Sequence, residues 1–292
     1  MKFVLAGDVG PAVGLGHRRR LEAVGTALAR MGHESTFVAV TPPGDTDVLG
    51  PDLVVVDSYL TRADDQSLYP ARLVAAIDEM GRGLDVDLVI DPTPGARTSG
   101  YSGTPRRVFA GAAYAIVAPD FAERPRPPRP RVERVLVTLG ASRAGAPAPA
   151  LAAAVAARHP GLRVQLAIGP WLDAAVIAGV EVVDAPHGLG ELIRDADIVV
   201  TAGGVTLLEA CASARATVSI PIAENQHHAV NFLVRAGATV RSELETAPEA
   251  IGRLIDDANA RQQLGRTART TIDGAGATRV AGALIELAEN GR

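Results

Sequence analysis

The sequence has little of several features that would assign it to a narrow class of protein. It contains one cysteine, Cys211, so a disulfide framework is excluded, and the apolar pattern around it predicts a small buried core side chain. No apolar run approaches the ~20 residues of a membrane-spanning helix. Besides Arg18-Arg19-Arg20 there is no basic run, and the net charge is −4, which argues against general nucleic-acid binding.

What is present indicates a globular chain of one large domain or two domains of ordinary size. The chain has 292 residues, and 47% of them are hydrophobic. Its first residues, MKFVLAGD, read as a strand entering a loop and not as a signal peptide. We therefore expect a cytoplasmic protein without membrane insertion.

Strands and helices alternate along the N-terminal half. Short apolar runs predict strands at residues 2–6, 35–40, 53–56 and 88–90, and helical periodicity covers residues 17–31 up to Gly32. Apolar strands separated by helices predict a parallel sheet that is covered on both faces.

The run ERPRPPRP at residues 123–130 divides the chain, because four prolines in eight residues predict a stiff surface connection. The pattern then restarts, with strands at 134–138, 163–168 and 181–183 and a helix at 148–157. We expect two Rossmann-like, doubly wound parallel-sheet domains, 1–122 and 132–292, that face a central cleft and are joined by a linker at 123–131. The last helix can cross back to the N-terminal domain.

A glycine turn in the C-terminal half is the most informative motif. Strand Ile198–Val200 runs into Gly203-Gly204, and a helix opens at Thr206. Free N–H groups and the positive end of the helix dipole at such a turn favour a phosphate. Thr206-x-x-Glu209 has two interpretations: a capping box, or a site in which Glu209 accepts hydrogen bonds from a ribose.

Further polar residues follow nearby strands. Asn225 and Gln226 come after the strand at 217–220 and Pro221, as turn residues or as ligand contacts at the carboxyl end of a strand. The runs Asp85-Val86-Asp87 and Asp195-Ala196-Asp197 could hold a divalent ion, but each precedes a strand, so we interpret them as solvated turn carboxylates. We predict no metal site and no cofactor.

A second glycine turn lies at the N-terminus, where Gly14-x-Gly16 opens a helix with His17 in its first turn. The helix dipole disfavours a protonated imidazole there, so His17 is a candidate general base. The alternative is a histidine that only caps or packs. Arg19 occupies the third glycine position of a dinucleotide fingerprint, which weakens that interpretation.

Together these motifs resemble the UDP-sugar hydrolase family of the pseudaminic acid pathway, within the GT-B glycosyltransferase superfamily. The matching residues run in order along most of the chain: Asp8, Val13, Gly14, Gly16, His17 and Arg20; Asp57-Ser58-Tyr59; Ile77-Asp78-Glu79; Ile90-Asp91; Gly111, Tyr114 and Phe121; and Gly204, Thr206, Glu209, Asn225 and Gln226. The chain departs from the family at Gly10, which replaces a serine, and at Gly140-Ala141-Ser142-Arg143, where Arg143 replaces a carboxylate.

The resemblance implies catalytic roles for His17, Asp57 and Tyr59. It implies substrate-binding roles for a larger set: Asp8, Gly14, Gly16, Arg20, Gly140, Ser142, Gly203, Gly204, Val205, Thr206, Glu209, Asn225 and Gln226. The implied partner is a nucleotide-diphosphate sugar, with UDP expected. We expect metal-independent, inverting hydrolysis of its anomeric C–O bond. Two alternatives are an inverting GT-B glycosyltransferase with a small-molecule acceptor and a non-catalytic sugar-nucleotide binding subunit.

Overall fold

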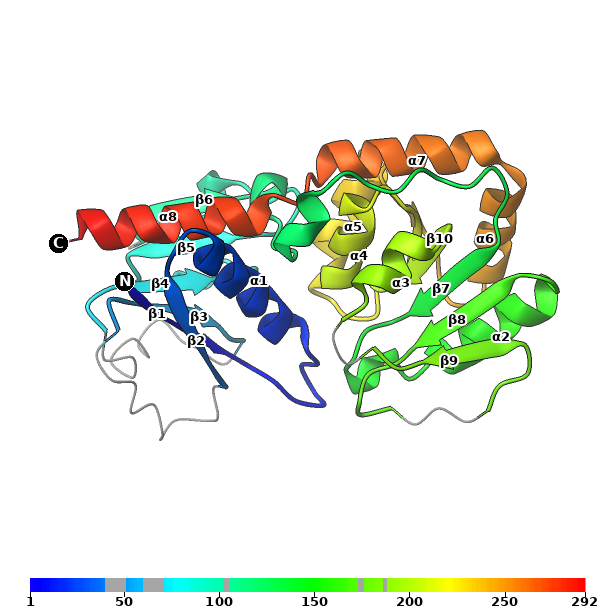
Figure 1. The fold of residues 1–292 in the computed structure, drawn as a ribbon, viewed down its shortest axis with the longest axis horizontal. Helices are drawn as coiled ribbons and strands as arrows, with labels where there is room; N and C mark the ends of the chain where they lie inside the picture. Colours follow the sequence, from blue (N-terminus) through cyan, green and yellow to red (C-terminus); the bar gives the residue numbers. More distant parts are fainter. Residues whose placement is uncertain (40–50, 60–70, 102–104, 173–175, 186–187, 292) are drawn as a thin grey trace. The chain divides into compact units, whose positions relative to one another are not determined.

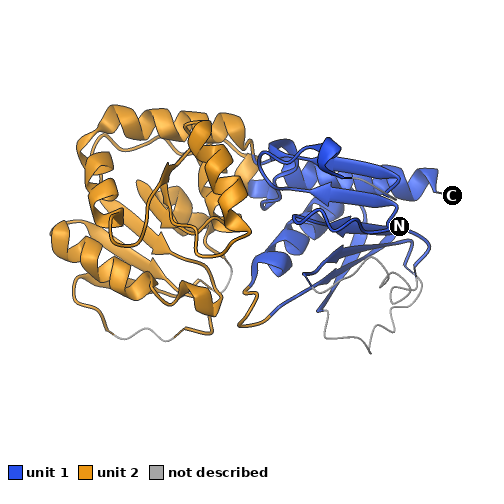
Figure 2. Cartoon of the chain, turned by 180° about the vertical axis from the view of Figure 1, so that it is seen from behind, with its two compact units in different colours: residues 1–9, 15–120, 274–292 blue, residues 10–14, 121–273 orange. Residues whose placement is uncertain are grey.

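The structure, a computed structural model, describes residues 1–39, 51–59, 71–101, 105–172, 176–185 and 188–291. The chain divides into two compact units (Figure 2). Unit 1 comprises Met1–Val9, Leu15–Asp120 and Gly274–Arg292, and unit 2 comprises Gly10–Gly14 and Phe121–Asp273.

Unit 1 is built on a six-stranded parallel sheet with the strand order β2-β1-β3-β4-β5-β6 (Figure 1). Its strands are β1 (Lys2–Gly7), β2 (Glu34–Ala39), β3 (Leu53–Asp57), β4 (Val74–Ile77), β5 (Leu88–Asp91) and β6 (Arg107–Ala110). Its helices are α1 (Gly16–Arg30) and α8 (Gly276–Asn290), and short 3-10 turns lie at η2 (Thr98–Gly100), η3 (Ala112–Tyr114) and η4 (Pro119–Ala122).

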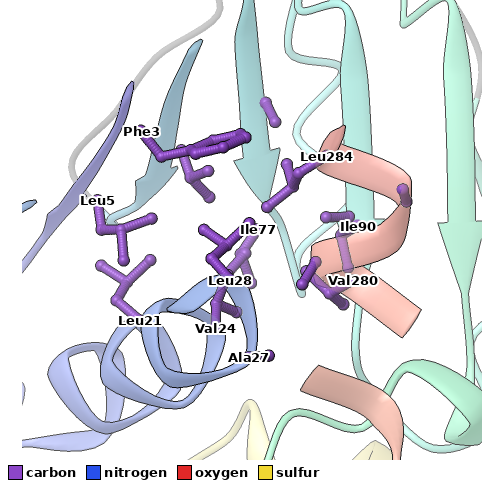
Figure 3. Packing of buried hydrophobic residues seen from close by; sticks show 14 of the residues in the cluster. Phe3, Leu5, Leu21, Val24, Ala27, Leu28, Ile77, Ile90, Val280 and Leu284 are labelled. Atoms are coloured by element: carbon purple, nitrogen blue, oxygen red, sulfur yellow. The ribbon is translucent and has the colours of Figure 1, made fainter. Parts of the chain in front are cut away.

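Helices α1 and α8 cover one face of this sheet although they lie at opposite ends of the sequence. Figure 3 shows Leu21 of α1 next to Leu5 of β1, and Leu28 of α1 and Leu284 of α8 belong to the same buried cluster. Alternate residues of the same strands point to the other face. The strands are apolar on both sides because both sides are buried.

Unit 2 repeats this architecture with the strand order β12-β11-β10-β7-β8-β9, again parallel throughout. Its strands are β7 (Arg134–Thr138), β8 (Arg163–Ala167), β9 (Val180–Val183), β10 (Ile198–Thr201), β11 (Ala216–Ser219) and β12 (Val240–Arg241). Its helices are α2 (Ala148–Arg158), α3 (Gly190–Asp195), α4 (Val205–Ala212), α5 (Gln226–Arg235), α6 (Ala247–Asp256) and α7 (Ala258–Thr271), with a 3-10 turn η5 (Arg143–Gly145).

The proline-rich segment is fastened to unit 2 by arginines. Arg269 donates to the carbonyl oxygens of Phe121 and Ala122, and Arg261 Nη2 donates to that of Pro130 at 2.9 Å. Arg215, which is buried, donates to the carbonyl of Arg126. Proline-rich backbone lacks N–H donors for a sheet, so its carbonyls accept from arginine side chains of the same unit instead.

The predicted fold of two Rossmann-like parallel-sheet domains is confirmed. No strand was expected at β4, β6 or β12. The sequence of β4, VAAI, is half alanine, that of β6, RVFA, begins with an arginine, and β12 has only two residues, so none of them reads as an apolar strand. Cys211 lies fully buried in α4, and burial raises the pKa of its thiol to about 12, as expected for a core residue. None of the helices in the described part of the chain is long and apolar enough to span a bilayer.

Two glycines of α8 provide a test of this packing. A methyl group on Gly276 would lie 2.0 Å from the Ala115 carbonyl oxygen, whereas one on Gly282 would meet nothing within 4 Å. We expect Gly276→Ala to destabilise the protein by about 1–3 kcal/mol through overpacking. Gly282→Ala, the matched control, should stabilise it by roughly 0.5–1 kcal/mol through helix propensity. Urea unfolding measures both, and equal effects would contradict the tight approach of α8.

Candidate functional site

Polar residues gather where three neighbouring strands of unit 1 end. Asp8 follows β1, Asp57 is the last residue of β3, and Glu79 follows β4 closely. Because β3 lies between β1 and β4, these residues meet at the carboxyl edge of the sheet. This edge is where ligands bind in open α/β sheets.

His17 reaches this edge from the first turn of α1. Its side chain is 3% exposed, and Nδ1 lies 2.6 Å from Asp57 Oδ1. The residue at the N-cap of α1 is Leu15, and no side chain caps the helix. The interpretation of His17 as a helix cap is therefore wrong. A bond to a buried carboxylate instead places the imidazole in a histidine–aspartate pair.

Arg20, one turn further along α1, binds the same carboxylate at both oxygens. Its Nε donates to Asp57 Oδ2 at 2.8 Å, and Nη2 donates to Oδ1 at 2.8 Å. Its Nη1 contacts Glu79, and the side chain is only 6% exposed. A planar guanidinium matches a carboxylate in this two-bond geometry. The expected contact of Arg20 with substrate stays a prediction, since each of its three nitrogens already contacts a protein group.

These contacts fix the ionisation of Asp57 and the tautomer of His17. Burial acts to raise the pKa of Asp57, but the Arg20 charge and the hydrogen bonds from His17 and Arg20 outweigh it, so this pKa lies below its usual range. An ionised carboxylate only accepts hydrogen bonds. His17 Nδ1 must therefore carry a proton toward Asp57, which leaves the lone pair on Nε2 to accept a proton.

Tyr59 packs against the imidazole ring of His17. Its ring meets that of His17 edge to face, with centroids 4.3 Å apart. Its hydroxyl donates to Glu79 Oε2 at 3.2 Å. Burial, reinforced by the Glu79 charge, raises the pKa of Tyr59 to about 12, so its hydroxyl is a proton donor and not a phenolate near neutral pH.

Asp8 completes the cluster and has an unused acceptor. Oδ2 accepts from the Tyr59 backbone N–H at 2.9 Å. Oδ1 is buried and has no hydrogen-bond partner among the described residues. A buried acceptor without a partner is costly, so a hydroxyl or amine from a ligand would relieve it. This supports the predicted substrate contact at Asp8.

A second polar group lies beside this cluster, at the ends of β4 and β5. Asp78 is fully buried and accepts from Arg82 Nε at 2.9 Å and from two backbone N–H groups. Asp91 accepts from the Tyr101 hydroxyl at 3.0 Å, and burial raises its pKa. Asp78, Glu79 and Asp91 belong to the motifs that carry the resemblance, but no role was predicted for them. What could have pointed to them in the sequence is their position at the ends of short apolar runs.

In unit 2 the glycine turn opens α4 as expected, but not through a capping box. The N-cap is Gly204, the first helical residue is Val205, and no side chain caps the helix. Thr206 lies inside the first turn, so the capping-box interpretation is wrong. Glu209 lies half-buried one turn further, and its expected contact with a ribose stays a prediction.

The side chain of Gln226 bridges this turn and the loop before α5 by hydrogen bonds. Its Oε1 accepts from the N–H groups of Gly203 at 3.2 Å and Ile222 at 2.9 Å. A methyl group on Gly203 would lie 2.7 Å from the Gln226 and Val230 side chains, so only glycine fits there. The Gly203 N–H is thus used within the protein, which leaves the N–H groups at the start of α4 for an anion.

The other predicted residues lie in turns and at the starts of helices. Gly16 begins α1, Gly14 and Gly140 have φ of 77° and 92°, Ser142 is the N-cap of η5, and Asn225 is the exposed N-cap of α5. The structure adds no ligand contact for any of them, so their binding roles stay predictions.

The paired aspartates lie at the amino ends of strands, as expected, but they are not simply solvated. Asp197 is 9% exposed and accepts from the backbone N–H groups of Glu133 and Arg134, where β7 begins. Asp87 likewise accepts from the Val74 N–H at the start of β4. Across the described residues, no group of three His, Cys, Asp or Glu side chains is placed to hold a metal ion.

Known structures share this fold, although no family model and no curated protein matches the sequence. The glycosyltransferase SnogD from Streptomyces nogalater aligns over 98% of this chain and 99% of its own, with a TM-score of 0.62 and 19% identity. The kitacinnamycin glycotransferase aligns over 98% of each chain, with a TM-score of 0.65 and 16% identity. Spinosyn rhamnosyltransferase SpnG in complex with thymidine diphosphate aligns over 99% and 100%, with a TM-score of 0.61 and 18% identity.

The chain therefore has the fold of GT-B glycosyltransferases. The GT-B fold that the resemblance implied is confirmed, whereas membership of the superfamily and of the narrower hydrolase family stays a prediction. At these identities the likeness establishes the fold, and the activity has to be argued from the site.

Asp57→Asn tests the buried ion pair. At pH 7 we expect a loss of roughly 3–5 kcal/mol in the free energy of unfolding, because Arg20 loses a charged partner in a buried position. The lowered pKa of Asp57 means that its stabilising effect is complete above the unfolded value of about 3.9 and is lost as the pH falls through the lower folded value. The gap between wild type and variant in urea unfolding should therefore stay constant down to about pH 4 and narrow as the pH falls further. The exposed control Asp85→Asn should change stability by at most about 0.5 kcal/mol, and a pH-independent gap would contradict the ionised pair.

Gln226→Met tests the bridge between the glycine turn and α5. The variant keeps the length of the side chain but removes the acceptor for two N–H groups, which should cost about 1–3 kcal/mol in urea unfolding. Gln263→Met on the exposed side of α7 is the matched control and should be nearly neutral. Equal stabilities of the two variants would show that the bridge contributes nothing.

Proposed function

We propose that this protein is an inverting GT-B glycosyltransferase that moves a sugar from a pyrimidine nucleoside diphosphate to a small-molecule acceptor. The observation that carries the proposal is the buried His17–Asp57 pair at 2.6 Å, set at the carboxyl edge of a sheet with this fold. Several of the similar structures are glycosyltransferases, and two of them contain thymidine diphosphate. These similarities favour transfer over hydrolysis.

His17 would act as the general base. Its Nε2 takes the proton from the acceptor hydroxyl or amine while the acceptor atom forms a bond to the anomeric carbon. The bond from that carbon to the diphosphate oxygen breaks, and its electron pair leaves with the nucleoside diphosphate. Attack opposite the leaving group inverts the anomeric centre. Asp57 holds the imidazole in the required tautomer and balances the charge of the imidazolium that forms.

Tyr59 and Asp8 would position the reacting groups. Tyr59 fixes the plane of the imidazole through its edge-to-face contact. The unpartnered Oδ1 of Asp8 can accept a hydrogen bond from a hydroxyl or amine of the sugar or the acceptor. A donor-rich ligand is favoured here over an anionic one, because ionised carboxylates only accept hydrogen bonds.

Unit 2 would bind the nucleotide. The N–H groups of Gly204, Val205 and Thr206 at the start of α4 would bind the diphosphate, and Glu209 the ribose. Gly140, Ser142 and Asn225 would line the nucleotide or the sugar. Charge on the leaving diphosphate would be stabilised by these N–H groups and the helix dipole, so we expect no need for a metal ion.

Hydrolysis, with water in place of the acceptor, is the second candidate. Hydrolysis is favoured by the contact between two motifs that carry the hydrolase resemblance. Tyr59, from the Asp57-Ser58-Tyr59 motif, donates to Glu79 of the Ile77-Asp78-Glu79 motif. The same histidine would then activate a water molecule, and the products would be a nucleoside diphosphate and a free sugar.

A substrate panel separates these functions. UDP- and TDP-linked sugars are incubated with and without hydroxyl and amine acceptors, and release of nucleoside diphosphate is followed with mass spectrometry of the products. We expect acceptor-dependent release that EDTA leaves unchanged. His17→Gln should lose 10²–10⁴-fold in rate with little change in TDP or UDP affinity by calorimetry. His33→Gln, in the same unit but outside the site, is the control.

Other outcomes point elsewhere. Equal release without acceptor, with free sugar as product, would favour the hydrolase. Tight nucleotide binding without turnover of any substrate would indicate a binding subunit and contradict both enzymes. A fully active His17→Gln variant would overturn the assignment of the base.

A further inference from the structure

Arg20 and Glu79 stand out because the proposed reaction does not use them directly, yet both are tied to the groups that it does use. Arg20 is 5% exposed and contacts Asp57, Glu79 and His17. Glu79 is 22% exposed and contacts both Arg20 and the Tyr59 hydroxyl. The contacts form a closed circuit, in which His17, Asp57, Arg20, Glu79 and Tyr59 each touch the next and Tyr59 touches His17 again.

We propose that Arg20 and Glu79 are positioning residues that set the tautomer and the proton affinity of His17 with opposite effects. This inference rests on the proposed role of His17 as the base. Arg20 acts through Asp57, and Glu79 acts through Arg20 and Tyr59.

The effect of Arg20 follows from its two bonds to Asp57. By occupying Oδ2 through Nε and sharing Oδ1 through Nη2, it fixes the carboxylate in one orientation and leaves Oδ1 facing His17 Nδ1. Its positive charge, with Nη2 3.1 Å from His17 Nδ1, also opposes protonation of the imidazole. Arg20 therefore offsets the negative charge of Asp57, which favours protonation.

Glu79 has the opposite effect. Its carboxylate balances the charge of Arg20 from the far side of the guanidinium and fixes the direction of the Tyr59 hydroxyl. Asp8, also at this edge, contacts the Tyr59 backbone. Asp78 and Arg82 lie next to the circuit at the end of β4, where Arg82 also donates to the Ser58 carbonyl. Among the described residues, the charged or titratable groups that contact His17 or its partners in the circuit are Asp57, Arg20, Glu79, Tyr59 and Asp8.

The experiment reads His17 directly, so that it does not depend on knowing the substrate. The protein is labelled with ¹⁵N-histidine, and the long-range ¹H–¹⁵N spectrum of the imidazoles is followed with pH in wild type, Arg20→Lys, Arg20→Met and Glu79→Gln. The chain has 6 histidines, and comparison with His17→Gln assigns the signals of interest. Arg82→Met is the matched control, because Arg82 also pairs with a buried aspartate at the end of a neighbouring strand.

In wild type we expect the neutral imidazole to carry its proton on Nδ1 alone. Arg20→Met should mix the two tautomers and move the titration midpoint of His17 to higher pH, because Asp57 is then unopposed. Arg20→Lys should mix the tautomers with a smaller shift, since lysine keeps the charge but lacks the planar pair of donors. Glu79→Gln should move the midpoint down, because the charge of Arg20 is then less balanced. If turnover is observed, the acidic limb of kcat/KM should move in the same directions.

Opposite shifts in Arg20→Met and Glu79→Gln, with no shift in Arg82→Met, would support the proposal, since a purely structural role gives no such sign. An unchanged tautomer and midpoint in the Arg20 and Glu79 variants would overturn it, as would the same shift in all variants including Arg82→Met. Arg20→Lys and Glu79→Gln keep the result interpretable if Arg20→Met does not fold. If the protein turns over no nucleotide sugar, the proposed function is refuted. The NMR spectra then still show whether Arg20 and Glu79 control the protonation of His17.

Discussion

A carboxylate buried at the end of a central strand has to be compensated, and in this protein that requirement organises the site. Asp57 is 1% exposed and has three hydrogen-bond donors around it, one from His17 and two from Arg20. Without them the charge would be expelled or neutralised. Because both partners come from the first turns of α1, compensation of Asp57 also fixes where that helix begins and which way its histidine faces.

The two units use the same architecture for different electrostatics. In unit 1 the carboxyl edge of the sheet collects carboxylates, with Asp8, Asp57 and Glu79 around one histidine and one arginine. In unit 2 the corresponding edge has a glycine turn that opens α4 with no side-chain cap. The first edge suits ligands that donate hydrogen bonds, and the second suits an anion. This division matches what the two halves of a nucleotide sugar and its acceptor require.

Arginine has a structural role in much of this chain. Arg215 and Arg261 donate to carbonyls of the proline-rich segment, and Arg269 donates to carbonyls of the two residues just before it. Arg20 and Arg82 compensate buried aspartates at neighbouring strand ends. Arg18 pairs with Glu22 and lies over the ring of Phe37, so its charge is engaged on the surface of α1. These arginines contribute to the net charge of the chain, but their side chains bind other groups of the protein.

The sequence by itself determined the alternation of strands and helices, the two glycine turns and the position of His17, since these depend on local periodicity and backbone freedom. It did not reveal β4, β6 and β12, which are alanine-rich, begin with an arginine, or have only two residues. Only the tertiary structure decided which side chains meet. His17 and Arg20 contact Asp57, which lies 40 and 37 residues away from them in the sequence. The side-chain oxygen of Gln226 accepts from the Gly203 N–H. Such pairings follow from strand order, which no local pattern encodes.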